Sequence, residues 1–155
     1  MSIWTDLLET AVHTPSPHNV QPWRIKIVSE TQADLFIDSV RTLPKEDTTG
    51  SFIILTMGMF IEALRILAAN KGFHLKHSIC REPSWYAREI LNTRGQVFLP
   101  FARLELTATA PVQDLTDAAT FLKRRTSRIS PKPDPIPAED IAVLWSLAET
   151  WKHRF

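Results

Sequence analysis

The stretch S51-FIILTMGMFIEALRILAAN-K71 decides the fold class of this 155-residue chain. Its apolar and helix-forming residues predict one helix over 51–71, with Ser51 as its N-cap and Gly72 placed where a C-terminal glycine belongs. Apolar side chains occupy nearly every face, which is typical of a central helix buried by other elements. The run is interrupted by small, polar or charged residues, at Thr56, Gly58, Glu62 and Arg65. A membrane span needs about 20 predominantly apolar residues, so we expect a protein that does not enter a membrane.

Alternating segments on both sides of this helix predict strands. Upstream, Arg24–Ser29 and Ala33–Val40 are separated by a short polar turn and predict a β-hairpin. Downstream, Phe73–Ile79 and Gln96–Thr107 predict two more strands, and Pro100 marks an edge position or a bulge. Shorter helices are expected from Ser2 to near His13, over Ser84–Leu91, over Leu115–Arg125, and from about Ala138. The predicted fold class is α+β: a small antiparallel sheet packed by helices around a central apolar helix.

The composition excludes several classes of protein. A net charge of +1 gives no general attraction to nucleic acid or anionic membranes. The single cysteine, Cys80, excludes an intramolecular disulfide and a multi-cysteine zinc site, and the histidines show no metal-ligand pattern. The four glycines stand alone, so neither a G-x-G-x-x-G turn nor a P-loop is present. The first residues lack the features of a signal peptide, and we expect a cytoplasmic protein.

The first chemically informative segment is PSPHNVQPW, at Pro15–Trp23, directly before a predicted strand. Its prolines stiffen the backbone and remove donors, while Ser16, Asn19 and Gln21 offer polar side chains. Such a rigid, partly polar ledge suits the face of a flat heterocycle. The alternative is a proline-rich turn anchored by a buried Trp23, and composition alone does not decide between the two.

The second segment is KRRTSR, at Lys123–Arg128, where four cations and two hydroxyls follow a predicted helix. One guanidinium group can bind two phosphate oxygens at once, and hydroxyls add further hydrogen bonds. The alternative is a solvated basic run, because cations near the C-terminus of a helix interact favourably with its dipole.

Together these segments resemble the nitroreductase superfamily. The family pattern P-S-x-x-N-x-Q-P-W leads into a strand and stands here as PSPHNVQPW. A second pattern, R-R-S-x-R, stands here as RRTSR at Arg124–Arg128 and is followed by PIPAEDIAVLWSLAE at Pro135–Glu149. The middle of the chain, FIDSVRTLPKEDTTG followed by the long helix, is similar to Acg-type nitroreductase-like proteins, which resemble two fused nitroreductase units.

The resemblance implies an FMN site. By position, Arg124, Arg125 and Thr126 would meet the phosphate, and Arg128 would approach the ribityl chain and the ring edge. The residues implied to line the isoalloxazine ring are Pro15, Ser16, Pro17 and Asn19. Gln21 and Trp23 would instead brace the loop. A cation near the ring would stabilise reduced flavin, and the flavin itself would perform the hydride chemistry.

Three departures from the family pattern bear on the expected organisation. The arginine segment comes last in this chain, whereas it comes first in single-unit nitroreductases. Thr126 stands where serine is usual, and Pro17 replaces a small polar residue and removes one donor. The order predicts a nitroreductase-like unit at 1–123 and the start of a second unit at 124–155. A homodimer or a missing second half would then complete the site.

The expected function is FMN-dependent transfer of hydride from NAD(P)H to nitroaromatic or quinone-like small molecules, with no side chain as obligate acid or base and no metal or nucleic acid. Two alternatives stay open. One is a non-catalytic module that binds or sequesters flavin. The other is a truncated interaction domain whose basic segment meets an acidic partner.

Overall fold

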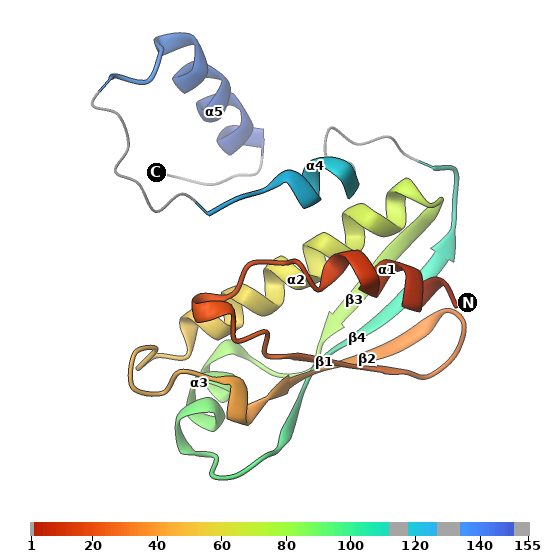
Figure 1. Ribbon diagram of the computed structural model, residues 1–155, viewed down its shortest axis with the longest axis vertical. Coiled ribbons are helices and arrows are strands. Elements are labelled where there is room, and N and C mark those ends of the chain that lie inside the picture. The colour runs from red at the N-terminus through yellow and green to blue at the C-terminus, as the bar shows by residue number, and fades with distance from the viewer. Residues whose placement is uncertain (1, 112–117, 127–133, 151–155) are drawn as a thin grey trace. The chain divides into compact units, whose positions relative to one another are not determined.

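The computed structural model describes residues 2–111, 118–126 and 134–150. In these ranges it has five α-helices, two short 3-10 helices and one four-stranded sheet (Figure 1). The chain divides into two compact units, Met1–Arg124 and Arg125–Phe155. The sheet and four of the five helices belong to the first unit, and the last helix belongs to the second.

The sheet is antiparallel throughout, with the strand order β1-β2-β4-β3. Its strands are β1 (Trp23–Ile27), β2 (Gln32–Asp38), β3 (Phe73–Ile79) and β4 (Phe98–Ala108). The predicted hairpin is confirmed, because β1 and β2 pair from Trp23↔Ile37 to Ile27↔Ala33. A bulge is confirmed beside Pro100, because Leu35 pairs with Ala102 whereas the next residue, Phe36, pairs with Pro100.

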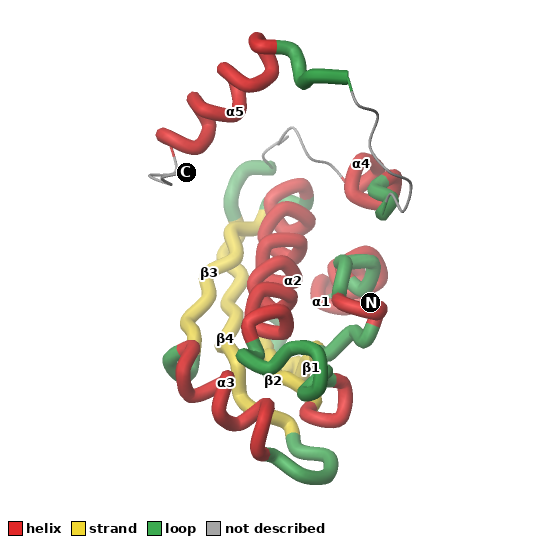
Figure 2. The backbone as a smooth tube through the Cα atoms, turned by 90° about the vertical axis from the view of Figure 1, so that its left-hand side faces the viewer, coloured by secondary structure: helices red, strands yellow, loops and turns green. Residues whose placement is uncertain are grey.

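The helices of the first unit are α1 (Ile3–Ala11), α2 (Ser51–Asn70), α3 (Pro83–Asn92) and α4 (Ala118–Lys123). α2 runs along one face of the sheet, and α1 packs beside it (Figures 1 and 2). The core between these layers is apolar. Its fully buried members include Trp4, Leu7, Ile37, Ile53, Met57, Phe60 and Leu64. The predicted α+β architecture, with a small antiparallel sheet against a central helix, is therefore confirmed.

The ends of α2 correct one expectation and confirm another. The N-cap is Gly50, at φ 70°, and not Ser51. The side chain that serves this end is Asp47, whose Oδ2 accepts a hydrogen bond from the backbone N–H of Ile53 at 3.0 Å. At the other end, Gly72 adopts φ 77°, the left-handed conformation expected after a helix.

The expectation that α2 is buried on every side is wrong for its first two turns. Phe52 is 53% exposed and Leu55 is 63% exposed. By length and composition α2 could cross a membrane, but half of it is buried within the fold. That burial, together with its packing on the sheet and on α1, is typical of the core helix of a soluble domain.

The second unit contains α5 (Ala138–Thr150), as the sequence predicts. Within the described part of that unit, most of its predicted apolar side is exposed. The residues that are at least 40% exposed include Ile141, Leu144, Trp145 and Leu147, whereas Ala148 is 8% exposed.

Candidate functional site

The Pro15–Trp23 loop connects α1 to β1 and has an unusual backbone. A short 3-10 helix, η1, spans Pro17–Asn19. Three residues have a positive φ: His18 at 47°, Asn19 at 56° and Gln21 at 48°. Such angles are uncommon outside glycine and concentrate at functional sites. The expected irregular turn is present, in a conformation that periodicity could not have predicted.

Hydrogen bonds within and behind the loop fix this conformation. The Ser16 Oγ accepts from the backbone N–H of Gln21 at 3.0 Å, and the Ser16 carbonyl accepts from Asn19 N–H at 3.0 Å. The Gln21 side-chain amide donates to the Val12 carbonyl at 3.1 Å. Gln21 thus braces the loop, as expected. The Ser16 hydroxyl, predicted to face the flavin, is already engaged inside the loop.

Trp23 anchors the loop in the core. It is 6% exposed and stacks on Phe60 of α2, with ring centroids 4.6 Å apart and an interplanar angle of 12°. The anchored-turn interpretation is therefore right for the buried end of the loop. It does not exclude the ledge interpretation, because His18 and Asn19 are exposed while Pro15 and Pro17 are partly buried.

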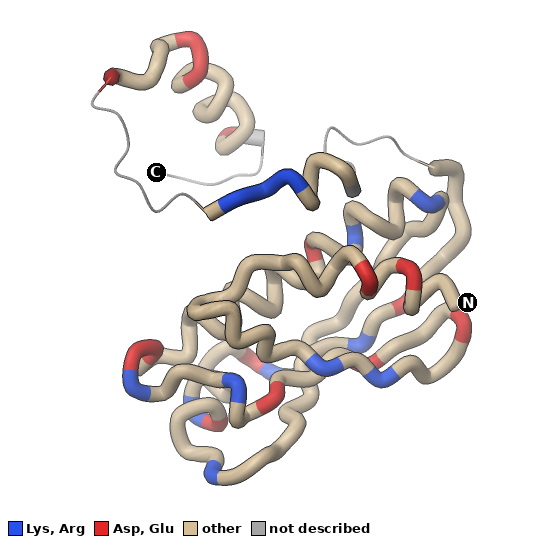
Figure 3. The backbone as a smooth tube through the Cα atoms, in the orientation of Figure 1, with Lys and Arg blue, Asp and Glu red and all other residues tan. Residues whose placement is uncertain are grey.

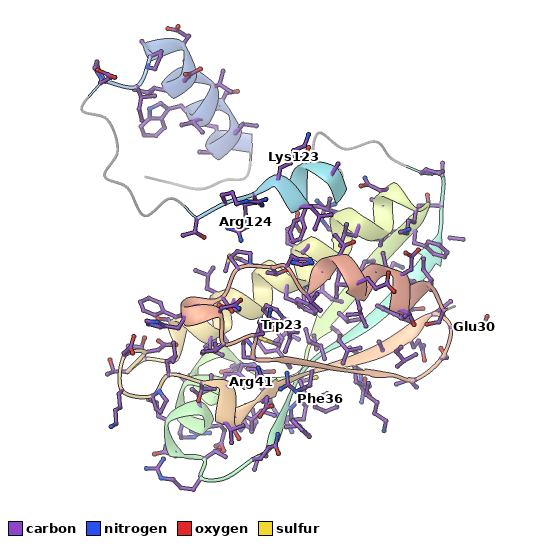
Figure 4. All side chains as sticks on the ribbon, viewed as in Figure 1. Trp23, Glu30, Phe36, Arg41, Lys123 and Arg124 are labelled. Atoms are coloured by element: carbon purple, nitrogen blue, oxygen red, sulfur yellow. The ribbon has the colours of Figure 1, made fainter. Side chains whose placement is uncertain are left out.

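A buried carboxylate beneath the loop was missed by the sequence analysis. Asp38, at the end of β2, is fully buried, and its Oδ2 lies 2.8 Å from Arg24 Nη2 and 3.8 Å from Arg41 Nε. Arg41, in the 3-10 helix η2 (Ser39–Arg41), and Trp23 are labelled in Figure 4. The available signal was the predicted hairpin: pairing Arg24 with Phe36 puts Arg24 diagonally across from Asp38.

The basic segment falls in three places. Arg124 follows α4 at the end of the first unit, Arg125 and Thr126 begin the second unit, and Arg128 lies outside the described residues. In Figure 3 the cations at and directly after the end of α4 form one blue stretch of the chain, and Figure 4 labels Lys123 and Arg124 there. The common site for this segment and the Pro15–Trp23 loop therefore stays a prediction.

The chemistry of the loop fits the ring of a flavin. Pro15 and Pro17 present rigid apolar surface, and the side-chain amide of Asn19 is exposed with no hydrogen bond among the described residues. His18 turns instead to Glu46, with Nε2 and Oε2 2.7 Å apart. Two stiff, partly buried prolines and one exposed amide are groups that suit the face and the edge of a planar heterocycle.

Curated relatives point to the same class of protein. The chain is 32% identical over 139 residues to a Mycobacterium tuberculosis protein named "Putative NAD(P)H nitroreductase", and the match covers 89% of this chain and 37% of that relative. It is 37% identical over 76 residues to an uncharacterized protein of the same organism, a match that covers 47% of this chain and 22% of the relative. The chain thus spans less than two fifths of the length of these relatives. No protein-family model matches it.

A solved structure shows the fold. The structure of a "putative nitroreductase in complex with FMN" from Exiguobacterium sibiricum aligns with a TM-score of 0.50 at 16% identity, over 91% of this chain and 87% of that chain. The chain therefore has a nitroreductase-like fold. With the M. tuberculosis relative, this confirms the predicted resemblance: the chain is a homologue of nitroreductase-like proteins.

Proposed function

We propose that this chain forms part of an FMN-dependent oxidoreductase that passes hydride from NAD(P)H, through flavin, to nitroaromatic or quinone-like acceptors. The observation that carries the proposal is the Pro15–Trp23 loop, which bears the family pattern and presents a rigid, exposed edge directly before β1. The name of the M. tuberculosis relative and the FMN in the Exiguobacterium structure support it.

The side chains would bind and orient the cofactor, and bound FMN would supply the hydride chemistry. Pro15, Pro17 and Asn19 would support the ring. Arg124, Arg125 and Thr126 would hold the phosphate by charge-assisted hydrogen bonds. Arg128 would lie near the ribityl chain and ring edge, where its charge favours the reduced, anionic flavin. Solvent would supply protons, since no side chain is assigned as acid or base.

A second nitroreductase-like unit would complete this site. It would come from a second copy of the chain or from a further part of a longer protein, because the chain matches only 37% of its M. tuberculosis relative. We place the protein in the cytoplasm, where NAD(P)H is available, with small molecules as its substrates.

Spectroscopy tests the proposal against its two alternatives. The purified chain is titrated with FMN, its visible absorbance is recorded, and its mass in solution is measured on the same sample. Flavin binding followed by anaerobic bleaching with NAD(P)H supports the oxidoreductase. Binding without bleaching identifies a non-catalytic flavin module. A chain that is dimeric in solution, stays colourless and does not bind added FMN contradicts both and favours an interaction domain.

The phosphate role predicts a specific loss. Replacing Arg124 and Arg128 together by alanine removes charge-assisted hydrogen bonds of about 1.5–3 kcal/mol each, which weakens FMN binding roughly tenfold or more per residue. Replacing the exposed Arg103 on β4 by alanine is the matched control and leaves the affinity unchanged. Equal FMN affinity in the double variant and the control would contradict the assignment.

A further inference from the structure

We propose that Asp38 is a positioning residue for the Pro15–Trp23 loop and acts through the guanidinium groups of Arg24 and Arg41. The positioned loop would support the flavin ring, so the identity of the ligand rests on the proposed function. The positioning itself rests on contacts within the first unit.

The four carbonyl oxygens of residues 20–23, at the end of the loop, accept hydrogen bonds from Arg24, Arg41 and Asp38. Arg41 Nη1 donates to the Val20 carbonyl at 3.2 Å. Arg24 Nη1 donates to the Gln21 carbonyl at 3.3 Å and to the Trp23 carbonyl at 2.7 Å. The backbone N–H of Asp38 donates to the remaining carbonyl, that of Pro22, at 2.7 Å.

The Asp38 carboxylate sets the orientation of both donors. Its Oδ2 faces Arg24 and Arg41, and the side-chain amide of Gln96 donates to the same oxygen at 3.4 Å. The other oxygen, Oδ1, accepts from the Val40 N–H at 3.3 Å. A fully buried carboxylate between two cations stabilises them against mutual repulsion, and a neutral group there would leave two like charges close together.

This arrangement explains how the left-handed backbone persists. The positive φ angles at His18, Asn19 and Gln21 each carry a conformational cost, so the surrounding structure must hold them. Ser16 fixes the loop from inside, while the two arginines fix the carbonyls that follow. Loss of the carboxylate releases the second set of contacts and lets the ledge of Pro15, Pro17 and Asn19 shift.

The test compares Asp38→Asn with Asp34→Asn. Asp34 lies four residues earlier on the same side of β2, is partly exposed, and makes no ion pair among the described residues. Amide hydrogen exchange without flavin is the first readout. Asp38→Asn should raise the exchange rate of the Gln21 amide roughly tenfold or more while the amides of α2 stay protected; Asp34→Asn should change neither. Unchanged exchange at Gln21 would overturn the inference.

FMN affinity is the second readout and separates the two proposals. Asp38→Asn should weaken FMN binding roughly tenfold, because displaced positioning groups commonly cost that much. If the parent chain is dimeric in solution and does not bind FMN, faster loop exchange in Asp38→Asn supports the positioning and refutes the flavin function. Faster loop exchange with unchanged FMN affinity refutes the link between them.

Arg41 provides a second variant in case Asp38→Asn does not fold. Its side chain is 47% exposed, so Arg41→Ala removes the contact to Val20 with little loss of packing. Arg41→Ala should loosen the loop, and Arg41→Lys, which keeps a donor and the charge, should restore part of the protection. Equal exchange rates at the Gln21 amide in the parent, Arg41→Ala and Arg41→Lys would count against the inference.

Discussion

Replacement of Tyr86 by phenylalanine gives a sharp test of the structure, because Tyr86 is the only tyrosine in the chain. It is 1% exposed on α3. Its hydroxyl accepts from the backbone N–H of Arg81 at 3.0 Å. It lies 3.0 Å from the carbonyl oxygens of both Pro100 and Phe101, which share its single hydrogen. One hydroxyl thus connects α3, the end of β3 and the bulge in β4.

The cost of Tyr86→Phe follows from the groups left behind. The Arg81 N–H and the Pro100 carbonyl lose this partner, whereas the Phe101 carbonyl keeps the N–H of Cys80 at 2.9 Å. The bond from the Arg81 N–H is part-buried; a buried polar group left unsatisfied costs about 1–3 kcal/mol, and the ring and its packing are retained. We expect a free energy of unfolding lower by about 2 kcal/mol and a Tm lower by roughly 6–8 °C.

Alkaline titration supplies a second, independent readout. Burial raises the pKa of the Tyr86 hydroxyl above its ordinary value of 10.0, and the hydrogen bond from the Arg81 backbone partly opposes this. Above pH 10 the unfolded state releases this proton while the folded state still holds it. The unfolded state then binds fewer protons, so the free energy of unfolding falls as pH rises from 10 toward the folded pKa. Tyr86→Phe abolishes this contribution.

The measurements are thermal melts from pH 7 to 11 and the absorbance change on tyrosine ionisation, which reports Tyr86 alone. Thr107→Val, which removes an exposed hydroxyl from β4, is the matched control. Two results would refute the reasoning: a Tm of Tyr86→Phe equal to that of the parent and the control, or a midpoint of tyrosine ionisation in the folded chain at or below pH 10.

Two further predictions concern glycines with a positive φ and the N-terminal end of α2. Gly72→Ala should cost more stability than Gly95→Ala, although both glycines have a positive φ. A methyl group at Gly72 would lie 3.0 Å from the Thr109 carbonyl oxygen, whereas at Gly95 none of the described atoms would lie within 4 Å of it. We expect about 1–2 kcal/mol at Gly95 and more at Gly72, measured by urea unfolding, and equal costs would contradict the packing argument. Asp47→Ala should cost about 1–2 kcal/mol because the Ile53 N–H loses its buried partner, and an unchanged urea midpoint would contradict this.

Elements specified by neighbouring residues could be predicted from the sequence. The hairpin follows from two alternating segments around a short turn, and its register is confirmed from Trp23↔Ile37 onward. Pro100 indicated the bulge because proline cannot complete a ladder. Gly72 marked the end of α2 because a left-handed residue is required there. In each case the physical cause lies within a few residues of its effect.

Features that depend on partners elsewhere could not be predicted in this way. Ser51 matched the preferred N-cap residues, but Asp47 reaches over Gly50 to Ile53 from a loop whose shape the sequence does not reveal. The apolar faces of α2 indicated burial all round, yet composition does not say which face is covered, and Phe52 and Leu55 are exposed.

The candidate site shows the same division between features set by neighbouring residues and features set by residues distant in sequence. The prolines of the Pro15–Trp23 loop predicted an irregular segment, and backbone carbonyls outside regular structure need other hydrogen-bond donors. Which donors meet that need depends on tertiary structure: Arg24 and Arg41 stand 17 positions apart, and both turn to Asp38 only because the hairpin folds back on itself. A charge reversal at Asp38 should therefore disturb the loop more than any single substitution among its exposed residues.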